Sequence, residues 1–157
     1  MLNEAVPGGS RWAYVFGSIL LFIFAMQAVT GVLLMFYYVP TADHAYASTQ
    51  YILHDVDYGW FLLSYHFWGS SAMVVCVFAH MSQVFLWGAY KKPRELIWVV
   101  GLALFALVMA FGFTGYLLPW DQRAYWATTV GVEIIDKVPV LGDFLARFLK
   151  GGATPDR

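Results

Sequence analysis

Charged residues are scarce in this chain, at 12% of 157 residues, whereas globular domains carry about 25%. The nine basic and ten acidic residues leave a net charge of −1, so no nucleic-acid partner is indicated. The single cysteine, Cys76, excludes a disulfide within the chain. Apolar surface is abundant instead, because 61% of the residues are hydrophobic and 19% are aromatic. This balance is typical of a membrane protein.

The hydrophobic residues are grouped into three long stretches, at 12–39, 60–87 and 96–119. Each exceeds the roughly 18 apolar residues that mark a membrane-crossing helix. The sequence therefore predicts an all-α membrane protein. A short N-terminal segment, 1–11, precedes a single domain of three transmembrane helices at 12–119.

Residues 120–157 are more polar and are expected to form an amphipathic surface region. Five apolar residues there follow the i, i+3, i+4, i+7, i+8 spacing of a helix about ten residues long. They are Leu141, Phe144, Leu145, Phe148 and Leu149. We expect this region to lie on the outer membrane surface rather than to cross it.

The charges in the connections predict the orientation. The turn after the second stretch carries Lys91, Lys92 and Arg94, whereas the connection 40–59 carries three aspartates and no lysine or arginine. Positive charge favours the cytoplasmic side. We therefore expect the N-terminus and the basic turn to be cytoplasmic, with the connection 40–59 on the opposite side.

One interval, 14 residues, recurs in each of the three stretches. The pairs are Gly17 and Gly31, His66 and His80, and Gly101 and Gly115. Fourteen residues fall about 40° short of four helical turns and rise about 21 Å, so each pair lies on one helix face at two depths.

The depths match when the second stretch runs opposite to the other two. The cytoplasmic level then holds Gly17, His80 and Gly101, and the outer level holds Gly31, His66 and Gly115. Glycines that serve only helix packing would not need this agreement. Histidine can ligate iron, and glycine lets a flat ring approach the backbone. The pattern predicts two stacked haem-like ligands, with His66 and His80 as axial iron ligands.

The remaining histidines cannot complete two bis-histidine sites. His44 and His54 both lie in the connection 40–59, ten residues apart, and we expect them to be solvated. A second pair of axial ligands must come from a fourth helix, either on another polypeptide or in a longer chain of which this is a fragment.

Several motifs resemble one family. The run KKPRELIWVVG after His80 and the segment GFTGYLLPWDQRAYWATTVG are similar to cytochrome b of quinol-oxidising bc and b6f complexes. The runs KKPREL and LPWDQ point to its b6-like branch, and VPVLGDFLARFLKGG resembles the surface helices before the family's fourth helix. The matching residues in the first stretch are Trp12, Gly17, Ser18, Gln27, Thr30 and Gly31.

The resemblance implies the first three helices of a four-helix bundle with two non-covalent b haems. His66 would ligate the low-potential haem and His80 the high-potential haem. The corner at 115–122 and an amphipathic helix starting near Trp126 would line a quinol-oxidation pocket. The candidate lining residues are Tyr116, Pro119, Trp120, Tyr125, Trp126 and Ala127.

The resemblance also implies a function and partners. The chain would be the di-haem subunit of a quinol:acceptor oxidoreductase in a respiratory or related electron-transport chain. It would carry electrons across the membrane between quinol oxidation and quinone reduction sites. Expected partners are quinol and quinone, a second cytochrome b-type subunit with the fourth helix, a Rieske-type iron–sulfur subunit and a cytochrome c-type subunit. The expected location is an energy-transducing membrane such as the bacterial inner membrane.

Some positions depart from the family pattern. Leu63 and Gln83 stand where the family usually has arginines for the haem propionates, so Arg11, Lys91 or another subunit would take that role. Cys76 is in mid-helix, and we expect no covalent haem on this chain. Asp121 and Arg123, near the mouth of the pocket, are expected to form an ion pair at its rim.

Two alternatives remain open at the level of sequence. One is a di-haem membrane anchor of a dehydrogenase or hydrogenase, which would share the histidine chemistry without needing the LPWDQ corner. The other is a non-redox structural membrane subunit, which the missing arginines and the missing second histidine pair would favour.

Overall fold

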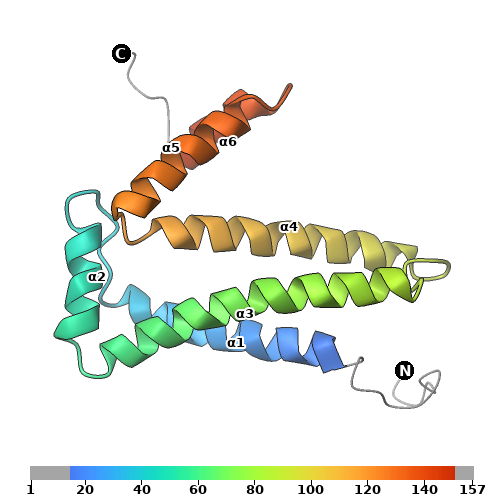
Figure 1. Cartoon of the computed structure of the whole chain (residues 1–157), viewed down its shortest axis with the longest axis horizontal. Coiled ribbons are helices and arrows are strands. Elements are labelled where there is room, and N and C mark those ends of the chain that lie inside the picture. The colour runs from blue at the N-terminus through green and yellow to red at the C-terminus, as the bar shows by residue number, and fades with distance from the viewer. Residues whose placement is uncertain (1–14, 151–157) are drawn as a thin grey trace.

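The computed structural model describes residues 15–150, which form six helices and no strand (Figure 1). Three of them are long and apolar enough to cross a membrane: α1 (Phe16–Met35), α3 (Gly59–Leu86) and α4 (Glu95–Leu117). They lie side by side, with α3 antiparallel to α1 and α4. The all-α fold with three membrane-crossing helices is therefore confirmed, while the predicted start at Trp12 lies outside the described residues.

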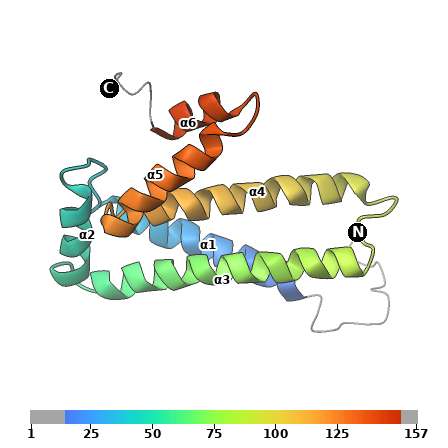
Figure 2. The ribbon, with the colours of Figure 1, turned by 45° about the horizontal axis from the view of Figure 1, so that its top comes forward.

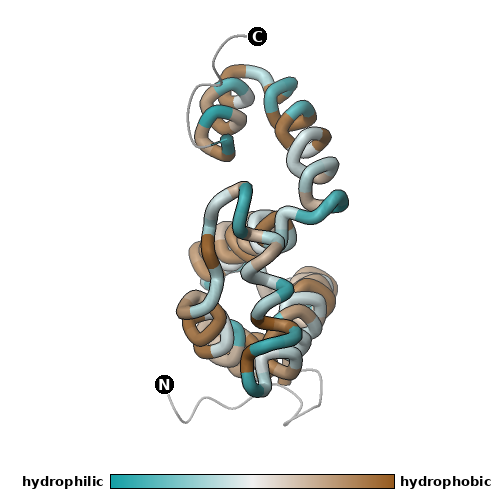
Figure 3. Tube along the Cα trace, turned by 90° about the vertical axis from the view of Figure 1, so that its left-hand side faces the viewer, coloured by the Kyte–Doolittle hydropathy of each residue, from teal (hydrophilic) through white to brown (hydrophobic). Residues whose placement is uncertain are grey.

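The closest packing is between α1 and α3. The buried residues of these two helices include Thr30 and Leu34 in α1 and Met73 and Val77 in α3. In contrast, no residue of α4 is buried, although Phe105 makes an edge-to-face ring contact with a phenylalanine of α3 at 5.1 Å. Figure 3 looks down the long helices and shows mainly hydrophobic residues in their bundle, and their mean hydropathies are 2.2, 1.5 and 2.6 for α1, α3 and α4. A helix that is apolar all round suits a membrane, because lipid or another subunit can cover its remaining faces.

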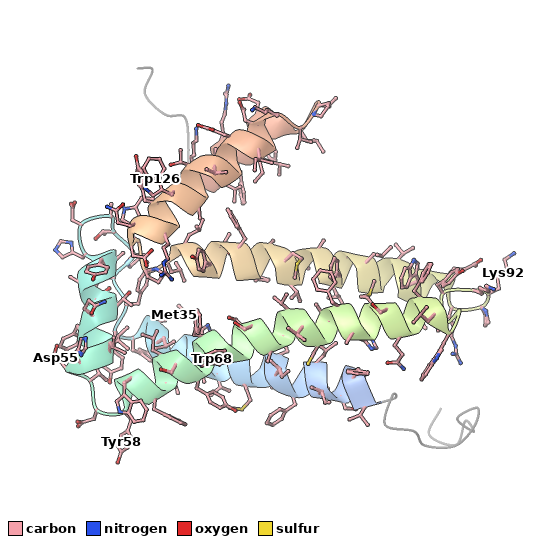
Figure 4. The ribbon with its side chains drawn as sticks, viewed as in Figure 1. Met35, Asp55, Tyr58, Trp68, Lys92 and Trp126 are labelled. Carbon is pink, nitrogen blue, oxygen red and sulfur yellow. The ribbon has the colours of Figure 1, made fainter. Side chains whose placement is uncertain are left out.

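A glycine in the left-handed conformation follows the end of α3. Gly88 has φ 64°. Its N–H donates to the carbonyl of Phe85 at 3.0 Å, and the N–H of Ala89 donates to the carbonyl of Val84 at 3.0 Å. These two bonds form a Schellman motif, in which glycine tolerates the positive φ without a steric penalty. The basic turn that follows lies at the opposite end of the molecule from Asp55 and Tyr58 (Figure 4).

The connection 40–59 contains a helix, α2 (Ala45–His54), that the sequence analysis did not predict. It lies across one end of the long helices (Figure 1). Its buried residues Ala45, Ser48 and Ile52 follow a spacing of three and four, which defines one helical face. The face was missed because two of these three residues are small and one is polar, so the pattern lacks the large apolar residues of a typical amphipathic stripe.

The C-terminal region forms two helices, α5 (Gln122–Asp136) and α6 (Gly142–Lys150). Figure 2 shows that α6 lies apart from the bundle of long helices, while α5 connects it to α4. The nine-residue α6 agrees with the predicted helix of about ten residues. However, α5 begins at Gln122 rather than near Trp126, because the side chain of Asp121 accepts a hydrogen bond from the N–H of Ala124 at 2.8 Å and caps the helix.

Two glycines of the C-terminal region lie in close contact with neighbouring segments. A Cβ at Gly131 would lie 2.6 Å from Cζ of Phe113 in α4, and a Cβ at Gly142 would lie 2.6 Å from the carbonyl oxygen of Ile135. Real Cβ atoms do not approach other atoms this closely. The two glycines therefore allow α5 to lie against α4 and α6 to turn back tightly on α5.

Candidate functional site

The two histidines of α3 point toward the two glycines of α1. A Cβ at Gly31 would lie 3.3 Å from Cε1 of His66, and a Cβ at Gly17 would lie 3.8 Å from Cε1 of His80. These are the two pairs that the 14-residue interval places at matched depths. Both imidazoles are half-buried. The structure thus brings together one histidine and one glycine at each level.

The glycines of α4 have open surroundings. A Cβ at Gly101 or at Gly115 would have no other described atom within 4 Å. The backbone of α4 is therefore accessible at these two positions. A flat ring at either level could contact it without moving a side chain of this chain.

His66 is held by two polar side chains of α1. Its Nδ1 lies 2.8 Å from Oγ1 of Thr30, and its backbone carbonyl accepts a hydrogen bond from Nε2 of Gln27 at 2.9 Å. A Cβ at Gly69 would lie 2.9 Å from Oε1 of Gln27, so this glycine makes room for the amide. From the sequence, Thr30 and Gln27 were identifiable only as matches to the family. The signal for Thr30 was its position beside Gly31, at the level of His66.

His80 has a different environment. Its Nδ1 is buried, and among the described residues it has no hydrogen-bond partner. The same holds for Oε1 of Gln83, one turn further along α3. Buried polar atoms are almost always hydrogen-bonded in a complete structure. We therefore expect a group from outside residues 15–150 to satisfy these two atoms.

These observations fit half of each predicted haem site. One imidazole is available at each level, and glycine leaves the facing helix backbone bare. The described residues contain no cluster of three or more metal-ligating side chains. Of the proposed propionate partners, Arg11 lies outside the described residues, whereas the ammonium of Lys91 lies 6.0 Å from the ring centroid of Tyr90.

The predicted quinol-pocket residues gather at the corner between α4 and α5, where Figure 4 labels Trp126. The ring centroids of Trp120 and Tyr125 are 6.3 Å apart, and those of Tyr125 and Trp126 are 5.4 Å apart, both nearly perpendicular. The remaining three candidates flank this cluster. Tyr116 is exposed, and Pro119 and Ala127 are half-buried.

The predicted rim ion pair is wrong. Asp121 caps α5 instead, and in the described range 15–150 the recorded ion pair is Arg147 with Asp143, at 2.9 Å. The carboxylate is used for the cap because the first N–H groups of a helix have no partner within the helix. The cap fixes the direction in which the chain leaves the corner.

Tyr38 ties the end of α1 to this corner, a contact that the sequence analysis missed. Its hydroxyl donates to the carbonyl of Leu118 at 2.7 Å, across 80 residues of sequence. Burial raises the pKa of this phenol above its ordinary value of 10.0. The neutral, donating form therefore persists over the whole neutral pH range.

We predict that Tyr38→Phe lowers the stability of the corner by at most about 1 kcal/mol, the usual net value of one hydrogen bond. A raised pKa means that this contribution is present below pH 10.0 and is lost as the pH rises through the folded-state value. Thermal unfolding of the purified protein at several pH values would measure it. The difference in unfolding temperature between wild type and variant should be the same at neutral and mildly alkaline pH. A difference that changes over this range would contradict the assignment.

Three apolar helices, one of which has two histidines that face two glycines of its neighbour, are typical of a membrane helical bundle that binds haem. Comparisons with known proteins point to the same class. The family model described as cytochrome b/b6/petB matches residues 1–157. Cytochrome b6 of a Cyanothece species is 44% identical over 97% of this chain and 68% of its own length. Cytochrome b6 of Gloeobacter violaceus is 43% identical over 96% of this chain and 70% of its own length.

A chain of a hyperthermophilic respiratory complex III has a similar structure, with a TM-score of 0.85 and 32% identity. The similarity covers 98% of this chain and 42% of that one. The chain belongs to the cytochrome b/b6 family and is an integral membrane subunit of the type found in bc and b6f complexes. Membership implies haem b as its cofactor.

Proposed function

We propose that this chain supplies one axial ligand to each of two non-covalent b haems, His80 at the cytoplasmic level and His66 at the outer level. The observation that supports this most directly is the pairing of both imidazoles with the α1 glycines, at 3.3 and 3.8 Å from the added Cβ positions. Haem b would supply reversible one-electron chemistry. The second imidazoles would come from a fourth helix carried by a second cytochrome b-type subunit.

The residues of this chain hold and separate the two sites. The histidines are 14 residues apart on α3, which is about 21 Å along a helix axis. At each haem level, α1 presents a glycine without a side chain, Gly17 at one level and Gly31 at the other. The α4 helix does the same with Gly101 and Gly115. Together with the second subunit, the apolar residues of α1, α3 and α4 would exclude water from the haem sites.

The corner between α4 and α5 is proposed as one wall of the quinol-oxidation pocket. Trp120, Tyr125 and Trp126 offer ring faces and edges against which a quinol head group can pack. Tyr116, Pro119 and Ala127 would complete this wall. The acceptor side would be provided by a Rieske-type iron–sulfur subunit and a cytochrome c-type subunit, with quinone reduced at the opposite side of the membrane.

The charges support one orientation in an energy-transducing membrane, which we propose to be the bacterial inner membrane. Lys91, Lys92 and Arg94 lie in the turn between α3 and α4, whereas α2 and the corner lie at the other end (Figure 4). By the positive-inside tendency, the basic turn is cytoplasmic. Quinol oxidation would then occur on the outer side.

The test is a reduced-minus-oxidised spectrum of the native assembly, purified in mild detergent. We expect two b-type components in a redox titration, both extractable with acidified acetone because Cys76 is a free, half-buried thiol in mid-helix. An assembly with no b-type band would refute the proposal. A co-purifying iron–sulfur subunit and inhibition by quinol-site ligands would separate it from a dehydrogenase or hydrogenase anchor.

A further inference from the structure

The two proposed haem ligands differ at the nitrogen that faces away from the iron site. Nδ1 of His66 lies 2.8 Å from Oγ1 of Thr30, whereas Nδ1 of His80 has no partner among the described residues. The difference follows from the residues of α1 that precede the two glycines. Thr30 precedes Gly31, and 14 residues earlier Phe16, which has no hydroxyl, precedes Gly17.

The direction of the hydrogen bond follows from the other contacts of Thr30. Its side chain is only 4% exposed, so water does not compete for the hydroxyl. The hydroxyl proton is directed to the carbonyl of Met26 at 2.7 Å. A hydroxyl has one proton to donate. Oγ1 therefore accepts from His66, which places the imidazole proton on Nδ1 and leaves the lone pair of Nε2 free.

We propose that Thr30 is a positioning residue that makes His66 a stronger iron ligand than the same imidazole without this bond. An imidazole that donates its other N–H is fixed in orientation and becomes more basic. A more basic ligand favours oxidised over reduced iron, so the bond lowers the midpoint potential of the haem at His66. This inference rests on the proposed function, because it requires His66 to be an iron ligand.

The backbone of α1 also restricts the orientation of the His66 ring. Because α1 and α3 are closely packed at this level, the ring of His66 is held between Thr30 and the bare backbone at Gly31. Rotation of the imidazole would break the Nδ1 bond or bring the ring into the backbone of α1. Thr30 thus acts on both the tautomer and the plane of the ring.

The test is Thr30→Val in the complete assembly, with a redox titration of both b-type components. Valine has nearly the same shape as threonine but cannot accept a hydrogen bond. We expect the reduced-to-oxidised ratio of the His66 component to rise up to tenfold at a fixed ambient potential, which corresponds to about 59 mV for one electron. The low-spin electron paramagnetic resonance signal of that component should also shift. The His80 component should not change.

Two further variants complete the test. Thr30→Ser keeps the hydroxyl and should restore the wild-type potential. Thr49→Val is the matched control, because the hydroxyl of Thr49 donates to the carbonyl of Ala45 at 2.9 Å, four residues earlier, as Thr30 does to Met26. We expect no change of either potential in that variant.

The outcomes separate the two proposals. Two haems with unshifted potentials in Thr30→Val would overturn the role of Thr30 and leave the proposed function standing. Loss of the His66 component in Thr30→Val supports the role if Thr30→Ser retains it at the wild-type potential, and overturns it if Thr30→Ser loses it as well. Absence of b-type components from the wild-type assembly would instead refute the proposed function.

Discussion

His66→Leu is expected to remove one of the two b-type components and His80→Leu the other, each leaving about half of the b-type absorbance. Leucine fills a comparable volume but has no nitrogen to offer to iron. The imidazoles belong to different levels, because they face Gly31 and Gly17 respectively. Redox titration of membranes containing each variant would show which component is lost, and we expect the low-potential one to depend on His66.

The other two histidines serve as matched controls. His44 precedes α2 and His54 is its last residue, and Nδ1 of His44 lies 3.1 Å from Oγ1 of Thr41 in the connection before that helix. His44→Leu and His54→Leu should therefore leave both components in place. If either control removed a b-type component, or if His66→Leu and His80→Leu both retained two, the assignment of ligands would be wrong.

Gly31→Val is expected to abolish the His66 component and to leave the His80 component intact. The first carbon of any side chain at this position would lie 3.3 Å from Cε1 of His66, and the two methyl groups of valine would reach further into the ring. The ring would have to turn away from the site. Spectra of the assembly before and after the substitution would measure the loss, and Gly31→Ala should give a smaller one.

The glycines of α4 allow a more discriminating comparison. A Cβ at Gly115 or at Gly112 would have no other described atom within 4 Å, so neither Gly115→Ala nor Gly112→Ala should disturb the fold of this chain alone. Only Gly115 belongs to the 14-residue interval. We therefore expect Gly115→Ala to weaken haem retention and Gly112→Ala to have little effect. Equal behaviour of the two variants would contradict a ring seated against Gly115.

The long-range order of the bundle was predictable because it follows from local rules. Apolar stretches of sufficient length define the three membrane-crossing helices, and helical geometry sets the depth of each residue within them. For this reason the contacts of His66 with Gly31 and of His80 with Gly17 could be anticipated from residue numbers and the reversed direction of α3. The sequence also predicted α6, whose large apolar residues repeat regularly.

The missed features depend on contacts between distant segments or on single polar atoms. The bond between Tyr38 and Leu118 joins residues 80 positions apart, and no local pattern encodes it. The hydroxyl of Thr30 could be placed at the level of His66, but its hydrogen bond depends on how closely α1 and α3 pack. Asp121 was assigned to an ion pair because charge is easy to read in a sequence, whereas its use as a helix cap depends on the backbone conformation.

The uneven burial of the long helices has a consequence for biogenesis. Since α1 and α3 bury residues against each other and α4 buries none, the first two can form a template before any other subunit arrives. The α4 helix is held less firmly until another subunit packs against it. We expect the order of events during maturation to reflect this hierarchy, with α1 and α3 paired early and α4 held in its final position only when the companion polypeptide docks.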